Sequence, residues 1–194
     1  ARRRGHGRAM MLDIARRLRE TGASRWALNV KPGNKPAVEL YKQVGFEFQF
    51  SAASFAFDWA LLDTLPRPEL ALRTQRADPS EYPELEALHG IDAGTLALRS
   101  ASPVVDVLRL VDPDQPESRR LGIASFDREF PGAYPFRAVS PEHALSLLHG
   151  MRPYADKDTM SMVIENAPAL DHYWTQAGAE VRLRFDHYQG PIPT

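Results

Sequence analysis

Seven consecutive residues near the start of the sequence have the types that bind phosphate. They are Arg2, Arg3, Arg4, Gly5, His6, Gly7 and Arg8, and an amphipathic segment follows them. A helix N-terminus offers unpaired N–H groups and a partial positive charge, and glycines let phosphate oxygens approach without meeting a Cβ atom. The pattern lacks both the Gly-Lys-Ser/Thr ending of a Walker loop and the third glycine of a dinucleotide fingerprint. By itself it fits a phosphate site and a basic surface loop equally well.

The charge of the chain is unevenly distributed. Residues 1–45 contain eleven Lys or Arg against three acidic residues, a net +8, and since the whole chain has −1, residues 46–194 carry −9. A positive segment of this kind favours a polyanionic partner, either nucleic acid or a phosphorylated small molecule, or it is simply a solvated helix face. The acidic remainder does not extend a basic surface, so we expect no nucleic-acid partner.

Other chemistries have little support. The absence of cysteine excludes disulfides, thiolate metal sites and a cysteine nucleophile. It fits the reducing cytoplasm, where we expect the protein, and it fits equally a lineage that avoids cysteine. The six histidines include no His-x-x-x-His pair and no Gly-x-Ser-x-Gly occurs, so we expect neither a metal nor a nucleophile elbow.

The Asp-His-Tyr triplets at 171–173 and 186–188 could line a polar pocket, but we favour structural roles, because neighbouring residues on a strand point to opposite faces. No apolar run could span a bilayer, and we expect no membrane partner.

The elements that position the basic segment follow from periodicity and capping residues. Apolar residues recur at helical spacing after Arg8 until Gly22, and Asn34 can cap a second helix that ends at Gly45. Two alternating Phe-rich runs, separated by Ser-Ala-Ala-Ser, indicate a hairpin. The expected order is a helix (8–21), a strand (25–30), a helix (34–45), a hairpin (46–59) and a linker with two prolines (61–68).

Residues 69–194 predict a second unit in which strands and helices alternate. The order is strand, two helices, three strands, helix, strand, helix and strand, with Ser140 as the cap and Pro141 as the first residue of one helix. This order indicates an α/β or α+β unit around a mixed sheet.

Two stretches together resemble adjacent motifs of the GNAT superfamily of N-acetyltransferases. They are "RRRGHGRAMM" and "LNVKPGNKPAVELYKQVGFE", in the usual order and at the usual separation, and the resemblance covers about residues 2–59. It implies that the loop of residues 2–8 binds the pyrophosphate of acetyl-CoA through main-chain N–H groups. It also implies that Asn34 lies near the pantetheine arm and that Tyr41 protonates the departing CoA thiolate. Read without the resemblance, Asn34 is a helix cap and Tyr41 is an aromatic residue facing the core.

The resemblance also predicts the domain organisation. Residues 1–60 match the C-terminal half of an acetyl-CoA-binding GNAT domain, the family's first four strands and two helices being expected before Arg2. After the linker, residues 69–194 repeat the order of the family's elements, but they have only Ser140 and Pro141 where the glycine loop would lie. We therefore expect a tandem GNAT architecture of the mixed α/β class, whose second domain lacks a pyrophosphate loop.

The function implied is transfer of an acetyl group from acetyl-CoA, as co-substrate, to a primary amine by direct attack. The acceptor would be a small molecule or a peptide amine, and a homodimer is compatible with the pattern. The alternative is a non-catalytic binding module that keeps the CoA-loop signature. The predominance of Arg over Lys suggests a bacterial gene.

Overall fold

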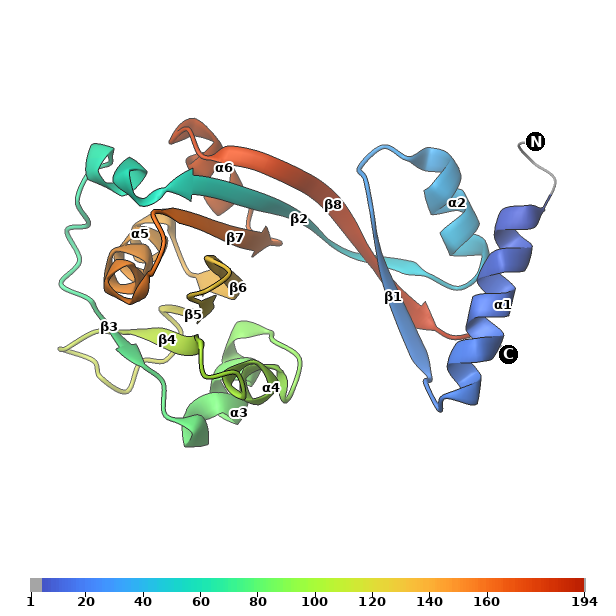
Figure 1. The fold of residues 1–194 in the computed structure, drawn as a ribbon, viewed down its shortest axis with the longest axis horizontal. Coiled ribbons are helices and arrows are strands. Elements are labelled where there is room, and N and C mark those ends of the chain that lie inside the picture. The colour runs from blue at the N-terminus through green and yellow to red at the C-terminus, as the bar shows by residue number, and fades with distance from the viewer. Residues whose placement is uncertain (1–4, 194) are drawn as a thin grey trace. The chain divides into compact units, whose positions relative to one another are not determined.

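The computed structural model describes residues 5–193, which divide into two compact units. Unit 1 comprises the described part of Ala1–Ala52 together with Arg184–Thr194, and unit 2 comprises Ala53–Leu183. Two long strands, β2 (Glu47–Asp58) and β8 (Glu180–Pro191), contribute residues to both units. The fold and its element labels are shown in Figure 1.

Unit 1 is a small antiparallel arrangement of strands with two helices. Its helices are α1 (His6–Glu20) and α2 (Lys35–Gln43), and its first strand is β1 (Arg25–Val30). The strand order is β1-β8-β2, so the last strand of the chain lies between two strands from its beginning (Figure 1). In the antiparallel register of β1 and β8, Arg25 lies opposite Pro191 and Val30 lies opposite Asp186.

The core of unit 1 combines both helices with residues of the C-terminal strand. Trp26 stacks on Phe46 with 4.4 Å between ring centroids, and Tyr188 is buried in the same cluster. A Cβ atom added to Gly190 would lie 1.9 Å from the backbone oxygen of Gly45. Only glycine at position 190 permits this close approach between β8 and the turn that follows α2.

Unit 2 has a mixed sheet in the order β2-β7-β6-β5-β4-β3. The pairs from β3 to β6 are antiparallel, and β6 and β7 are parallel. Its strands between β2 and β8 are β3 (Arg73–Arg76), β4 (Val105–Val111), β5 (Gly122–Asp127), β6 (Gly132–Ala138) and β7 (Thr159–Glu165). Its helices are η1 (Trp59–Thr64), η2 (Pro79–Glu81), α3 (Tyr82–His89), α4 (Thr95–Ser100), α5 (Pro141–Met151), η3 (Arg152–Tyr154) and α6 (Pro168–Gln176).

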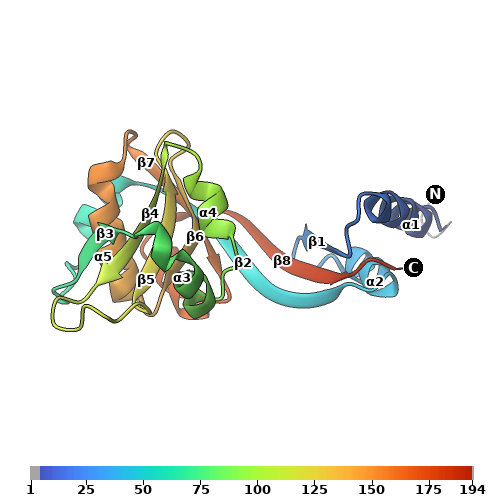
Figure 2. The same cartoon turned by 90° about the horizontal axis from the view of Figure 1, so that it is seen from below.

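The two faces of this sheet are covered by different helices, as Figure 2 shows for α5 on one side and α3 and α4 on the other. Alternating residues of β4 illustrate the arrangement: Leu108 and Leu110 pack in the main core with α5 and α6, whereas Val107 packs in a smaller cluster with α3 and α4. The main core includes the stacked rings of Phe57 and Trp174, whose centroids are 5.5 Å apart. The mixed α/β class predicted from the sequence is confirmed.

The structure corrects three local predictions. The predicted hairpin is wrong, because β2 continues through residues 51–54; that segment has no turn-forming Gly, Asn or Asp, and the Ser51 hydroxyl donates to Asp186 at 2.7 Å. The linker expected at 61–68 begins inside η1, where Leu62 is buried in the core. Helix α1 starts at His6 rather than Arg8 because Gly5, in the left-handed conformation, provides its N-cap.

The observed units also differ from the predicted ranges 1–60 and 69–194. Residues from Arg184 onward group with unit 1 because they pair with β1, a long-range pairing that local patterns do not specify. The assignment of 69–194 to a second GNAT-like domain stays a prediction.

Candidate functional site

The predicted phosphate segment forms the first turn of α1 rather than a long loop. Gly5 has φ 76°, and a Cβ atom added there would have no heavy atom within 4 Å. The first helical hydrogen bond runs from the Ala9 N–H to the Gly5 carbonyl at 3.0 Å, so the N–H groups of residues 6–8 precede the intrahelical ladder. The turn has no acidic residue and no side-chain cap. These features fit an anion at this helix end.

Gly7 has a different role from Gly5. A Cβ atom on Gly7 would lie 3.0 Å from the Cδ2 atom of Leu40, so this glycine lets the first turn of α1 approach α2. Leu40 directly precedes Tyr41, the candidate proton donor, on α2. The contact with Leu40 gives Gly7 a packing role, and the assignment of Gly5 and Gly7 to phosphate binding stays a prediction.

Two arginines in the second half of α1 are paired with acidic residues of the same helix. Arg16 pairs with Asp13 and Glu20 at 2.8 and 2.6 Å, and Arg17 pairs with Asp13 at 2.9 Å. These exposed pairs are ordinary helix-surface interactions. Among the described residues, Arg8 forms no ion pair, and the side chain of His6 is exposed. Arg2, Arg3 and Arg4 lie outside the described residues.

Asn34 and Tyr41 both show the structural roles that their local patterns indicate. The Oδ1 atom of Asn34 accepts from the Ala37 N–H at 3.4 Å, so Asn34 caps α2. Tyr41 is half-buried beside the core of unit 1, and its ring meets Phe46 edge-on at 5.9 Å. Its hydroxyl makes no hydrogen bond to a described residue. A packed ring with an uncommitted hydroxyl is compatible with proton donation, which stays a prediction for this residue.

The two triplets disfavoured as sites occupy separate places. In β8, Asp186 accepts from Ser51, whereas the Nδ1 atom of the next residue, His187, lies 2.8 Å from Asn29 Oδ1. The other triplet lies on α6. No group of three or more metal-ligating side chains occurs among residues 5–193. No helix within that range is both long and apolar enough to cross a membrane.

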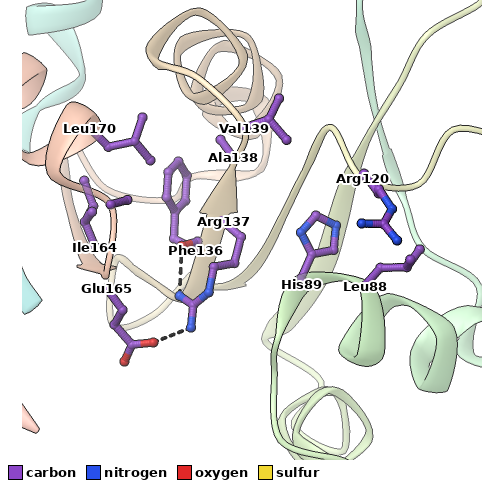
Figure 3. Close-up of a pocket in the computed structure, with 11 residues that line it drawn as sticks. Leu88, His89, Arg120, Phe136, Arg137, Ala138, Val139, Ile164, Glu165 and Leu170 are labelled. Atoms are coloured by element: carbon purple, nitrogen blue, oxygen red, sulfur yellow. Dashed lines mark hydrogen bonds and ion pairs between the residues drawn. The ribbon is translucent and has the colours of Figure 1, made fainter. Parts of the chain in front are cut away.

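A cavity in unit 2 was not anticipated from the sequence. Strands β6 and β7 pair at Gly132–Ser161 and Ala133–Met162, and a cavity of about 260 Å³ lies beside the following parts of both strands (Figure 3). Arg137 from β6 forms an ion pair with Glu165 from β7. His89 and Arg120 face them from α3 and from the segment before β5 (Figure 3). No motif links these residues, because the sheet brings together segments that lie far apart in the sequence.

The histidine in this cavity is held neutral. Its Nε2 atom lies 2.8 Å from the Arg119 carbonyl oxygen, which can only accept, so Nε2 carries the proton. Burial lowers the pKa of His89, and the charges of Arg137 and Arg120 lower it further, outweighing the hydrogen bond to Arg119. The permanent charges at the cavity are therefore two guanidinium groups and one carboxylate.

Residues 1–46 match the model of the acetyltransferase (GNAT) family. A GCN5-related N-acetyltransferase from Sphaerobacter thermophilus is similar with TM-score 0.61 and 14% identity, over 100% of this chain and 70% of that chain. A functionally unknown conserved protein from Staphylococcus epidermidis gives TM-score 0.65 and 8% identity, over 92% and 77%. A tandem GNAT protein from the clavulanic acid biosynthesis pathway gives 0.53 and 15%, over 100% and 72%. The comparison with curated proteins found no match.

Proposed function

From membership of the GNAT superfamily, which the family match over residues 1–46 and the shared fold support, we propose that this protein transfers an acetyl group from acetyl-CoA to a primary amine. The observation that carries the proposal is the first turn of α1. It combines a left-handed Gly5 and no acidic side chain with N–H groups and an Arg8 side chain that have no partner among residues 5–193. A pyrophosphate fits such a helix end because the backbone donors and the helix dipole both favour negative charge.

Each residue of the candidate site then has a defined task. The N–H groups of residues 6–8 would hold phosphate oxygens, and Arg8 would add charge. Asn34 would keep the start of α2 ordered beside the pantetheine arm. Acetyl-CoA, when bound, would supply the acetyl group from its thioester, and CoA would leave as the thiol once the C–S bond breaks. The Tyr41 hydroxyl would hold the proton that the departing sulfur requires, because a phenol is a donor at neutral pH.

Two separate Arg→Gln substitutions on α1 test where CoA binds. We expect Arg8→Gln to weaken CoA binding about five- to tenfold and to reduce its salt dependence, since a charge-assisted contact is lost. Arg17→Gln is the matched control, because Arg17 lies further along α1 and is paired with Asp13. Titration calorimetry on both variants measures the difference. Equal affinities would remove the first turn of α1 from the binding site.

Transfer itself can be followed by release of thiol from acetyl-CoA in the presence of a panel of primary amines. The protein contains no cysteine, so it contributes no background to a thiol-reactive dye. Amine-dependent thiol release supports the proposal. CoA binding without thiol release for small-molecule and peptide amines would instead support the non-catalytic binding module.

A further inference from the structure

We propose that His187 is the general base of the acetyl transfer and that Asn29 is the residue that positions it. This inference rests on the proposed function, and it concerns only residues of unit 1. Three neighbouring strands contribute the side chains that carry it: Asn29 comes from β1, His187 from β8 and Phe50 from β2.

The contact between His187 and Asn29 fixes which ring nitrogen carries the proton. The two residues lie opposite each other in the register of β1 and β8, and Nδ1 of His187 lies 2.8 Å from Oδ1 of Asn29. Because an amide oxygen only accepts, Nδ1 donates this hydrogen bond and carries the proton. The lone pair of the neutral ring is therefore on Nε2, where it can accept a proton from a ligand.

The other surroundings of His187 hold the ring and leave Nε2 accessible. The ring stacks on Phe50, with 4.7 Å between the centroids and 13° between the planes. Nε2 makes no hydrogen bond within residues 5–193, and the protein does not enclose it. Two contacts thus orient the imidazole, and its basic nitrogen stays open to a ligand.

This histidine lies on the face of unit 1 that α1 and α2 do not cover. In β1, Trp26 and Val30 are buried in the core with both helices, whereas Asn29 is exposed on the opposite face. His187 shares the face of Asn29, because residues directly opposite in paired strands point to the same side. An acceptor amine can therefore reach His187 without displacing a helix.

Asn29 also lies at the end of unit 1 that carries the candidate CoA site. A turn of residues 21–24 joins α1 to β1, so the two run in opposite directions, and the first turn of α1 lies at the end where β1 finishes (Figure 1). Asn29 is the last residue but one of β1, and Asn34 at the start of α2 follows closely in the chain. The proposed base and the N–H groups of residues 6–8 therefore belong to the same end of unit 1.

In the proposed step, Nε2 of His187 takes a proton from the nitrogen of a primary amine while the nitrogen lone pair forms the N–C bond to the acetyl group. The C–S bond breaks, its electron pair goes to sulfur, and sulfur takes the proton of the Tyr41 hydroxyl. His187 returns its proton to the Tyr41 oxygen through solvent. Amine and thioester thus become amide and thiol, and no other reactant is required.

The protonated nitrogen of His187 can be measured without turnover. Long-range ¹H–¹⁵N NMR spectra of the whole chain distinguish a protonated ring nitrogen from a bare one, and the spectrum of His187→Gln identifies the signals of His187 by their loss. In slightly alkaline buffer we expect a protonated Nδ1 and a bare Nε2. A neutral ring protonated at Nε2 would overturn the proposal.

Kinetics test the role of Nε2. His187→Gln should lower kcat for thiol release by roughly 10²- to 10⁴-fold and leave CoA affinity unchanged. His172→Gln is the matched control, because His172 is the exposed histidine of the other Asp-His-Tyr triplet, on α6. Wild-type turnover in His187→Gln refutes the base and leaves acetyl transfer standing. Absence of amine-dependent thiol release from the unaltered chain refutes the proposed function, and the base with it.

Two substitutions of Asn29 test the positioning role. Asn29→Asp keeps an acceptor oxygen, so it should keep the protonated Nδ1 and most of the activity. Asn29→Ala should lose the Nδ1–H tautomer and lower kcat by roughly tenfold, because the ring is no longer held with Nε2 bare. If Asn29→Ala keeps both the tautomer and kcat, the contact is only structural and the positioning role is wrong.

Discussion

Tyr41 places its ring and its hydroxyl in different surroundings. The ring packs edge-on against Phe46 in the core of unit 1, and the hydroxyl has no hydrogen-bond partner among residues 5–193. The Tyr41 ring can therefore contribute to packing while its hydroxyl contributes to catalysis. Substitutions can separate these two contributions, because one depends on the ring and the other on the hydroxyl.

Replacing Tyr41 by Phe keeps the ring and removes only the hydroxyl. If the hydroxyl protonates the departing thiolate, thiol release should slow by roughly 10²- to 10⁴-fold while CoA affinity and unfolding are unchanged. Tyr41→Ala should instead lower the free energy of unfolding by about 2–3 kcal/mol, since a half-buried ring is lost. Full turnover in the Phe variant would leave Tyr41 with the packing role alone.

At the scale of elements, the starts of α1 and α5 differ in what occupies them. The first turn of α1 has no acidic residue and no side-chain cap. The start of α5 is capped by Ser140, and Glu142 in its first turn accepts from the backbone N–H groups of Glu69 and Leu70 at 2.9 and 3.3 Å. The first turn of α1 therefore offers backbone N–H donors and no negative charge to a phosphate. At the start of α5, Ser140 already accepts from a backbone N–H and Glu142 adds a negative charge.

We therefore expect one CoA molecule per chain, bound by unit 1. Native mass spectrometry and calorimetric stoichiometry measure this number directly. In Arg8→Gln the single binding event should weaken, with no second event remaining at high affinity. A stoichiometry of two, or tight binding that is indifferent to Arg8, would place a cofactor in unit 2 and contradict the prediction.

Ion pairs attach η2 to the sheet of unit 2. Glu81 lies 3.2 Å from Arg109 and 3.1 Å from Arg119, and it accepts from the Asp78 N–H at 3.0 Å. Burial alone would raise the pKa of Glu81, but the Asp78 hydrogen bond and the two arginines outweigh it and lower that pKa. The ionised carboxylate therefore stabilises the fold above its ordinary pKa of 4.5, and this stability is lost as pH falls through the lower folded-state value.

Glu81→Gln should lower the free energy of unfolding at pH 7 by about 1.5–3 kcal/mol, because the buried Arg109 loses its charged partner. It should also make stability less dependent on pH below about 4.5. Urea unfolding at several pH values measures both effects. Glu84→Gln serves as the control, because Glu84 is exposed and lies 3.5 Å from Arg119. Similar losses in the two variants would mean that the Glu81 network adds little.

At the scale of the whole molecule, the end of the chain completes the unit formed by its beginning. Residues of β8 pair with β1, and Tyr188 and Ile192 are buried in the core of unit 1. The Ile192 N–H donates to the Ser24 carbonyl at 3.0 Å. Unit 1 is therefore discontinuous in sequence, and its core depends on residues that follow unit 2.

A chain that ends at Leu183 should lose the fold of unit 1 and keep that of unit 2. Hydrogen exchange should show loss of protection in α1 and β1, because Trp26 would lose the strand opposite it. A synthetic peptide of residues 184–194 should restore protection. Persistent protection of α1 without the peptide would show that the first 52 residues fold without the last strand.

Several local elements and the family resemblance could be predicted from the sequence alone. Asn34 and Ser140 were identified as caps, and residues 25–30 as a strand, because capping and short apolar runs act between neighbouring residues. The glycine-rich start and the "NKPAVELYKQVGF" stretch indicated the GNAT fold, which the structure and the comparisons confirm.

Only the tertiary structure decided how distant segments meet. It placed β8 beside β1, with His187 and Asn29 in contact across 158 residues, and it joined the two Phe-rich runs into one strand. It also brought His89, Arg120 and Arg137 around one cavity. Strand pairing and cavity formation depend on packing and hydrogen bonds between segments whose local patterns would permit several partners, so no single stretch of the sequence specifies them.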